Sequence, residues 1–301
     1  MMGPFIDPFL DNQFMVRALV AGILVSVSCA VVGTFVVLRG LAFIGDALAH
    51  GVLPGIAGAL LLGLPGMAGA AVGALAMIGG VALVTRYSRL SSDTAIGLLF
   101  VAMLALGVVI VSRSTSFTGD LVGILFGQIL GSSQDGIITQ AVAAVIVAAV
   151  AVVCARPFLL LSFDPEQADV AGFSSRLYHA IMLVLVAMTV VVSFQTVGTL
   201  LVFGMLLAPA GAGALLAHRI GLMMVVAAII GSVSAYLGLL ISYHFDVAAG
   251  ATMVLVATVI FFGVLVVTNV RAAGQGGSHP PAGPTESKTA PWSPAATVDR
   301  P

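Results

Sequence analysis

Residues 15–38 read MVRALVAGILVSVSCAVVGTFVVL, an apolar run in which Arg17 is the only charge. About 20 such residues in a helix cross the hydrocarbon core of a bilayer. Comparable runs follow at 41–63, 67–85, 95–112, 136–155, 177–195, 197–217, 221–243 and 248–269. We therefore expect an all-α polytopic membrane protein with eight or nine transmembrane helices, because the run at 197–217 can break at Pro209. Residues 121–130 are too few to span and predict a half-helix or re-entrant segment.

The composition excludes several classes of protein. Hydrophobic residues make up 60% of the 301 residues and charged residues 8%, the mean hydropathy is +1.19 and the net charge is −1. Soluble domains carry about a quarter charged residues, so a soluble enzyme, a nucleic-acid binder and a disordered scaffold are excluded. The one lysine is Lys288, so no GxxxxGK[ST] loop exists and another subunit must hydrolyse any ATP. Cys29 and Cys154 lie in apolar runs, which predicts buried thiols rather than a disulfide.

Three regions follow along the chain. Residues 1–14 form a short N-terminal segment without the cationic start of a signal peptide, and residues 15–271 form the transmembrane domain. Residues 272–301 are rich in Gly and Pro and predict a disordered tail. Alternate span ends carry Arg39, Arg86, Arg89, Arg156, Arg176, Arg219 and Arg271. The positive-inside rule places this end and the tail in the cytoplasm, and the N-terminus outside.

One carboxylate and one imidazole lie deep within the predicted spans. Asp46 and His50 share a helix face at i,i+4 spacing, about 10 and 16 Å from the border marked by Arg39. Such a pair is half of a site for Zn²⁺ or Mn²⁺. Pro54 lacks an N–H and predicts a helix break near the site that frees the carbonyl of His50. The alternative is a hydrogen-bonded pair that locks two helices together.

The longest polar interruption between spans is SFDPEQADVAGF at residues 162–173. It predicts a short amphipathic helix, because Asp164 can cap it, Pro165 suits its first position and Glu166 favours its positive end. Its acidic character favours docking of a soluble partner over contact with the anionic cytoplasmic leaflet. Val170 and Phe173 form its expected apolar face.

Other candidate features are weaker. His244 and Asp246 close a span on the predicted outer side and could form an outer gate for a cation, although an interfacial anchor and solvated turn is the alternative. His179 and His218 are expected at cytoplasmic helix ends. Gly69 and Gly73 form a GxxxG, which favours close helix packing over a lined pathway.

The stretch VVLRGLAFIGDALAHGVLPG at 36–55 resembles the GDALSHAVLPG signature of the metal-ion ABC transporter permeases, a bacterial family of zinc, manganese and iron uptake. Further matching stretches are DTAIGLLF at 93–100, LFGQIL at 125–130, TVGTLLV at 196–202, Pro209 in a PAA-like element, and 238–250, similar to LLLSYYLDLPSG. The resemblance covers roughly residues 15–270. Ala49, Gly51 and Ala248 depart from it, standing where serine, alanine and proline are usual.

The resemblance implies an ABC importer permease fold and a homodimer in the bacterial plasma membrane. Its implied partners are a cytoplasmic ABC ATPase subunit and an extracytoplasmic solute-binding protein, and the divalent metal is cargo rather than cofactor. Asp46 and His50 match the metal path of the family. The ATPase-coupling helix of the family is matched by Asp164, Pro165, Glu166, Ala168 and Gly172.

Two other classes stay open at this stage. A gradient-driven secondary metal transporter or channel is compatible with the spans and the Asp46–His50 pair. A membrane-embedded metalloprotease is the third class, but the sequence lacks HExxH.

Overall fold

The computed structural model describes residues 7–112 and 127–275, and within these ranges every regular element is a helix. The helices are α1 (Asp7–Asp11), α2 (Gln13–Leu38), α3 (Ala42–Gly51), α4 (Leu53–Leu61), α5 (Gly66–Tyr87), α6 (Ser92–Ser112), the 3₁₀ turn η1 (Ile129–Gly131), α8 (Gln134–Val153), α9 (Ala155–Phe163), α10 (Pro165–Val170), α11 (Ser175–Val197), α12 (Thr199–Leu216), α13 (Ile220–Phe245) and α14 (Ala249–Gln275). Eight described stretches are long and apolar enough to span a membrane, with α3 and α4 together forming one, and α12 adds a shorter apolar helix. The predicted all-α membrane architecture is confirmed.

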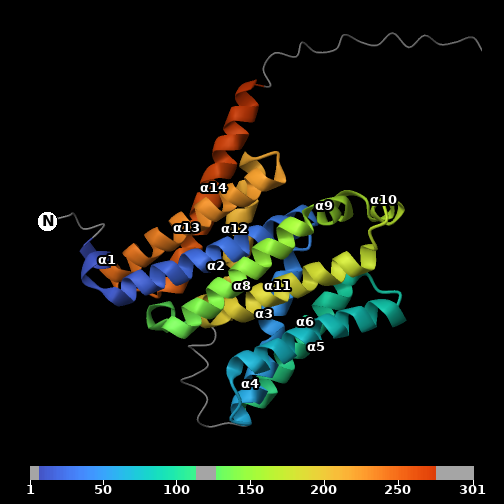
Figure 1. Cartoon of the computed structure of the whole chain (residues 1–301), viewed down its shortest axis with the longest axis horizontal. Coiled ribbons are helices and arrows are strands. Elements are labelled where there is room, and N and C mark those ends of the chain that lie inside the picture. The colour runs from blue at the N-terminus through green and yellow to red at the C-terminus, as the bar shows by residue number, and fades with distance from the viewer. Residues whose placement is uncertain (1–6, 113–126, 276–301) are drawn as a thin grey trace, which may run out of the picture.

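Helix α2 forms the centre of the bundle (Figure 1). It packs against α8, α11, α12 and α13, and 72% of its spanning window is buried, against 17% for α6. The hydroxyls of Ser26 and Thr34 donate to the carbonyls of Gly22 and Ala30 one turn earlier, so these polar groups are satisfied inside the apolar core. The exposed apolar faces of α5, α6 and α14 are those expected to contact lipid.

Glycines allow several helices to approach closely. A side chain on Gly33 would overlap the carbonyl oxygen of Leu206, so α2 and α12 nearly touch through their backbones. Gly55 of α4 and Gly69 of α5 contact each other in the same way, and a Cβ on Gly73 would lie 2.8 Å from the carbonyl oxygen of Gly51. The GxxxG at Gly69 and Gly73 therefore serves close helix packing.

Pro209 does not break its helix. Helix α12 continues through it from Thr199 to Leu216, although Pro209 cannot donate a hydrogen bond to the carbonyl of Met205. Membrane helices tolerate such a proline when neighbouring helices surround it, and Pro209 is buried where α12 packs against α2, α13 and α14.

Some expectations concern residues at the limits of the described ranges. Residues 121–126 of the predicted half-helix at 121–130 lie outside the described ranges. Its last two residues, Ile129 and Leu130, belong to η1. At the other end of the chain, α14 continues past Arg271 to Gln275, and the remainder of the tail lies outside the described residues. Cys29 and Cys154 are free and buried, as predicted.

Candidate functional site

The candidate site lies where α3 gives way to α4. Helix α3 ends at Gly51, and α4 begins at Leu53 with Pro54 in its first turn, where the missing N–H of proline removes no helical bond. The predicted break near Pro54 is present, and it falls at Val52. The N–H of Val52 is directed toward the carbonyls of Leu48 and His50. The single long span expected from the sequence is therefore two helices joined at the level of the site.

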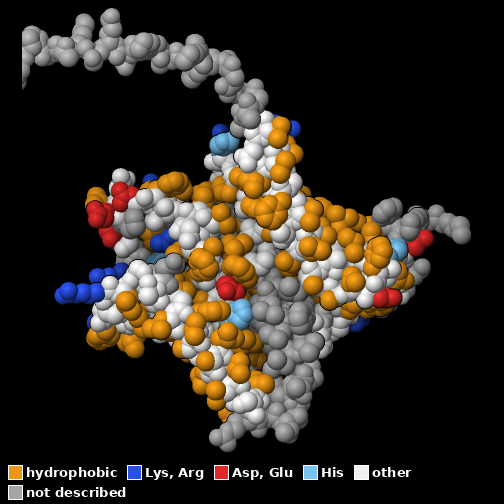
Figure 2. Space-filling view, turned by 180° about the vertical axis from the view of Figure 1, so that it is seen from behind, with side chains coloured by type: hydrophobic (Ala, Val, Ile, Leu, Met, Phe, Trp, Pro, Cys, Tyr) orange, Lys and Arg blue, Asp and Glu red, His pale blue; other side chains and the backbone are white. Residues whose placement is uncertain are grey.

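Asp46 and His50 contact each other one turn apart on α3. Nδ1 of His50 lies 3.3 Å from Oδ1 of Asp46 and 3.0 Å from the backbone carbonyl oxygen of Asp46. The Asp46 side chain is 33% exposed and the His50 side chain 14% exposed. Figure 2 shows an acidic and a histidine side chain side by side in the middle of an apolar face.

The contacts of His50 select one tautomer. A carbonyl oxygen can only accept, so the hydrogen bond to Asp46 places a proton on Nδ1, and in the neutral imidazole the lone pair is then on Nε2. A neutral imidazole with its other nitrogen held by an oxygen acceptor is the usual form of a metal-ligating histidine. The ring of Phe100, on α6, meets the His50 ring edge to face, with centroids 5.1 Å apart, and restricts its rotation.

The pair does not join two helices, because both residues belong to α3. In the described ranges no three side chains of His, Cys, Asp or Glu gather to hold a metal ion. One chain therefore presents two candidate ligand side chains, which is fewer than the four of a closed zinc site.

The predicted coupling segment forms the short helix α10. Oδ1 of Asp164 accepts hydrogen bonds from the N–H groups of Glu166 and Gln167 at 2.9 and 3.2 Å, which is the expected N-cap. Ala168 is buried, and Asp169 accepts two hydrogen bonds from Ser175 that fix the following turn.

The expected apolar face of this segment divides in two. Val170 is 91% exposed, whereas Phe173 packs against the Tyr178 ring. Gly172 adopts φ +85°, a conformation that favours glycine. The result is a capped helix with an exposed apolar tip.

The structure does not bring the two candidate outer-gate residues together. Nδ1 of His244 bonds the carbonyl oxygen of Leu240, and its ring meets Tyr243 edge to face. Asp246 ends α13 with a φ of 52° and lines a hollow of about 640 Å³ with Phe14, Ser242 and neighbouring residues. In the described part of the chain neither residue contacts the Asp46–His50 pair.

Sequence reasoning missed a contact made by another histidine, His179. Nη1 of Arg39, after α2, donates to Nδ1 of His179 in α11 at 3.1 Å, although 140 residues separate them. Partial burial lowers the pKa of Arg39, but an arginine side chain still stays charged in a protein. Nδ1 of His179 is thus the acceptor, and His179 is more than a helix-end residue. The sequence places both residues at the same membrane border, and this shared position was the available signal that they could meet.

The described residues form a polytopic bundle of apolar helices, with a partly exposed carboxylate–imidazole pair on α3. The chain belongs to the ABC 3 transport family, whose family model matches residues 11–268. It is therefore a multi-pass membrane subunit, or permease, of an ABC transporter in the bacterial inner membrane. This membership decides against the gradient-driven transporter and the membrane metalloprotease.

Curated relatives share most of their length with this chain. The manganese transport system membrane protein MntC of Listeria monocytogenes is 38% identical over 86% of this chain and 92% of its own. A protein of Haemophilus influenzae, named as a probable iron transport system membrane protein, is 37% identical over 87% of this chain and 96% of its own.

Solved structures confirm the fold. PsaBC from Streptococcus pneumoniae, in complex with Fab, matches with a TM-score of 0.80 and 34% identity, over 88% of this chain and 95% of that chain. A metal-chelate type ABC transporter in an inward-facing conformation matches with a TM-score of 0.70 and 16% identity, over 84% and 85% of the two chains. The second likeness shows the fold alone.

Proposed function

We propose that two copies of this chain form the translocation pathway of a binding-protein-dependent importer for a divalent transition metal, with Asp46 and His50 as ligands of the passing ion. The observation that carries the proposal is the pair itself, which is held on one helix with Nε2 of His50 available. Two ligands from each copy supply four, which suits tetrahedral Zn²⁺ or a more open Mn²⁺ shell.

The identity of the ion follows from the donor set and the relatives. Carboxylate and imidazole both serve manganese, iron and zinc. The relatives are named for manganese and iron, so these two ions are the first cargo to test, with zinc as the third. A transport site should hold its ion only moderately, because an ion bound too firmly cannot leave.

The partners follow from family membership and from α10. A separate cytoplasmic ATPase subunit hydrolyses ATP, since this sequence has no phosphate-binding loop with lysine, and an extracytoplasmic solute-binding protein delivers the ion. The capped α10, with Val170 exposed at its tip, supplies the surface on which the ATPase docks. Asp246, with His244 nearby along the chain, stands at the entrance to the pathway as an outer gate.

The test is uptake of radiolabelled manganese, iron and zinc by cells that express equal amounts of each variant. Asp46→Ala and His50→Ala should each abolish uptake while homodimer assembly and ATPase association survive. Asp46→Asn should fail almost as fully, because the amide keeps the shape but loses the charge that offsets desolvation of a dication.

The matched control is His218→Ala, which removes an exposed histidine at the junction of α12 and α13. This variant should transport normally. Normal uptake by Asp46→Ala would end the metal-path proposal. Loss of folded protein in both alanine variants, with Asp46→Asn rescued, would assign the pair to structure instead.

A further inference from the structure

A cavity of about 740 Å³ opens between α3, α5, α6 and α11, at the end of the bundle where Arg39 lies. Figure 2 shows the surface hollowed here, between the lobe of α9 and α10 and the lobe of α5 and α6, with basic side chains beside the hollow. The walls are mainly apolar, formed by Leu41, Ile44, Ile78, Val81, Ile96 and Leu183. The polar side chains of the lining include Arg86, Arg176 and His179.

The positive charge of this cavity has no counter-charge in the described part of the chain. Arg86 and Arg176 form no ion pair there, and the guanidinium carbon of Arg86 lies 5.8 Å from the centre of the Tyr87 ring. His179 is bonded to Arg39, which places a third cation behind the wall. Of the carboxylates around α10, Asp164 caps the helix and Asp169 accepts hydrogen bonds from Ser175, and neither forms an ion pair with Arg86 or Arg176 in the described part of the chain.

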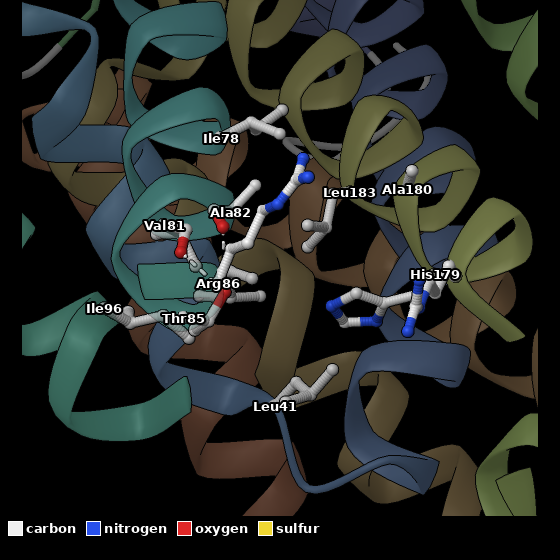
Figure 3. A pocket seen from close by; sticks show the side chains of 12 residues that line it. Leu41, Ile78, Val81, Ala82, Thr85, Arg86, Ile96, His179, Ala180 and Leu183 are labelled. Carbon is white, nitrogen blue, oxygen red and sulfur yellow. Dashed lines mark hydrogen bonds between the residues drawn. The ribbon is translucent and has the colours of Figure 1, made fainter. Parts of the chain in front are cut away.

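The direction of Arg86 is the second observation. Figure 3 shows its side chain running from the end of α5 back along the cavity, toward Ile78 and Leu183. An arginine at the end of a membrane helix normally extends outward to water. Both Arg86 and Arg176 remain exposed, so an anion that enters the cavity can reach their guanidinium groups.

We propose that this cavity binds an anionic phospholipid, with its phosphate between Arg86 and Arg176 and an acyl chain along the apolar wall. The arginine distribution places the cavity at the cytoplasmic leaflet, which is anionic. Basic pockets between membrane helices on this side are suited to lipid phosphate, and guanidinium groups match its geometry. The apolar wall distinguishes this occupant from a free phosphate ion. The proposal is independent of which ion the permease carries.

The experiment is native mass spectrometry of the purified full-length chain, titrated in detergent with phosphatidylglycerol or with phosphatidylethanolamine. Wild type should retain phosphatidylglycerol in preference to the zwitterionic lipid. Arg86→Gln and Arg176→Gln should each weaken retention about fivefold, and the double variant about 25-fold, from the usual contribution of a basic residue near an anionic surface. Arg271→Gln, in the last part of α14, is the matched control and should bind like wild type.

Further arms keep the test decisive. The Arg86→Lys, Arg176→Lys double variant preserves charge and should keep most of the binding, which separates a charge effect from misfolding. Unchanged retention in the double glutamine variant, or equal retention of both lipids by wild type, would overturn the proposal. Displacement of the lipid by inorganic phosphate alone would also overturn it, because the cavity would then be a site for a free anion.

Discussion

Replacing Gly55 by alanine should loosen the contact between α4 and α5. A Cβ at this position would overlap the carbonyl oxygen of Gly69 and lie 2.8 Å from the backbone nitrogen of Gly73. Backbone atoms cannot rotate away as a flexible side chain can, so α4 must retreat from α5. Overpacking of this kind costs about 1–3 kcal/mol, while alanine gains about 1 kcal/mol over glycine in a helix interior. After the gain from alanine is subtracted, the free energy of unfolding should fall by up to about 2 kcal/mol.

Gly58 supplies the matched control on the same helix. No heavy atom lies within 4 Å of a Cβ built at Gly58, so Gly58→Ala should leave stability unchanged or raise it by up to about 1 kcal/mol. Unfolding of both purified variants in mixed micelles, followed by far-ultraviolet circular dichroism, measures the difference. Gly55 follows Pro54 directly, so Gly55→Ala should also reduce metal uptake. Equal stability of the two variants would refute the close backbone contact.

Three further outcomes are expected. Phe100→Leu should raise the KM of metal uptake about fivefold at unchanged expression, because the aromatic contact with His50 is worth about 1 kcal/mol; an unchanged KM would show that the ring does not position the ligand. Asp164→Ala should weaken co-purification of the ATPase, since it removes a cap worth about 1 kcal/mol, and Asp164→Ser should restore it; an intact complex with alanine would contradict the docking assignment. A cysteine at Ser287 should react with a membrane-impermeant thiol reagent only after cells are permeabilised, and labelling of intact cells would reverse the orientation.

The spans and the contact between Asp46 and His50 could be predicted because both depend on local patterns. Apolar runs of sufficient length define membrane helices, and the i,i+4 spacing of Asp46 and His50 places them on one face of α3. Pro54 predicted a helix break, and the structure places this break two residues earlier, at Val52. At Pro209 the same rule left a break possible, but the helix continues through the proline, where neighbouring helices surround it.

The missed features depend on contacts between distant segments. Phe100 reaches His50 from α6, and its apolar run gives no sign of which helix it will face. His179 meets Arg39 across 140 residues, and only the packing of α11 on α2 brings them together. The cavity with Arg86 and Arg176 likewise exists only once four helices are assembled.

The hydrogen bond from Nδ1 of His50 to the backbone of Asp46 has a mechanical consequence. Asp46 and His50 are both fastened to one helix, so a tilt of α3 carries these two candidate ligands together without changing their mutual geometry. In the proposed homodimer, capture and release of the ion are then governed by the separation of two rigid α3 helices, rather than by rotation of individual side chains. A movement of the helices that widens this separation removes half of the coordination shell in one step, and the ion is released to the side that has just become accessible.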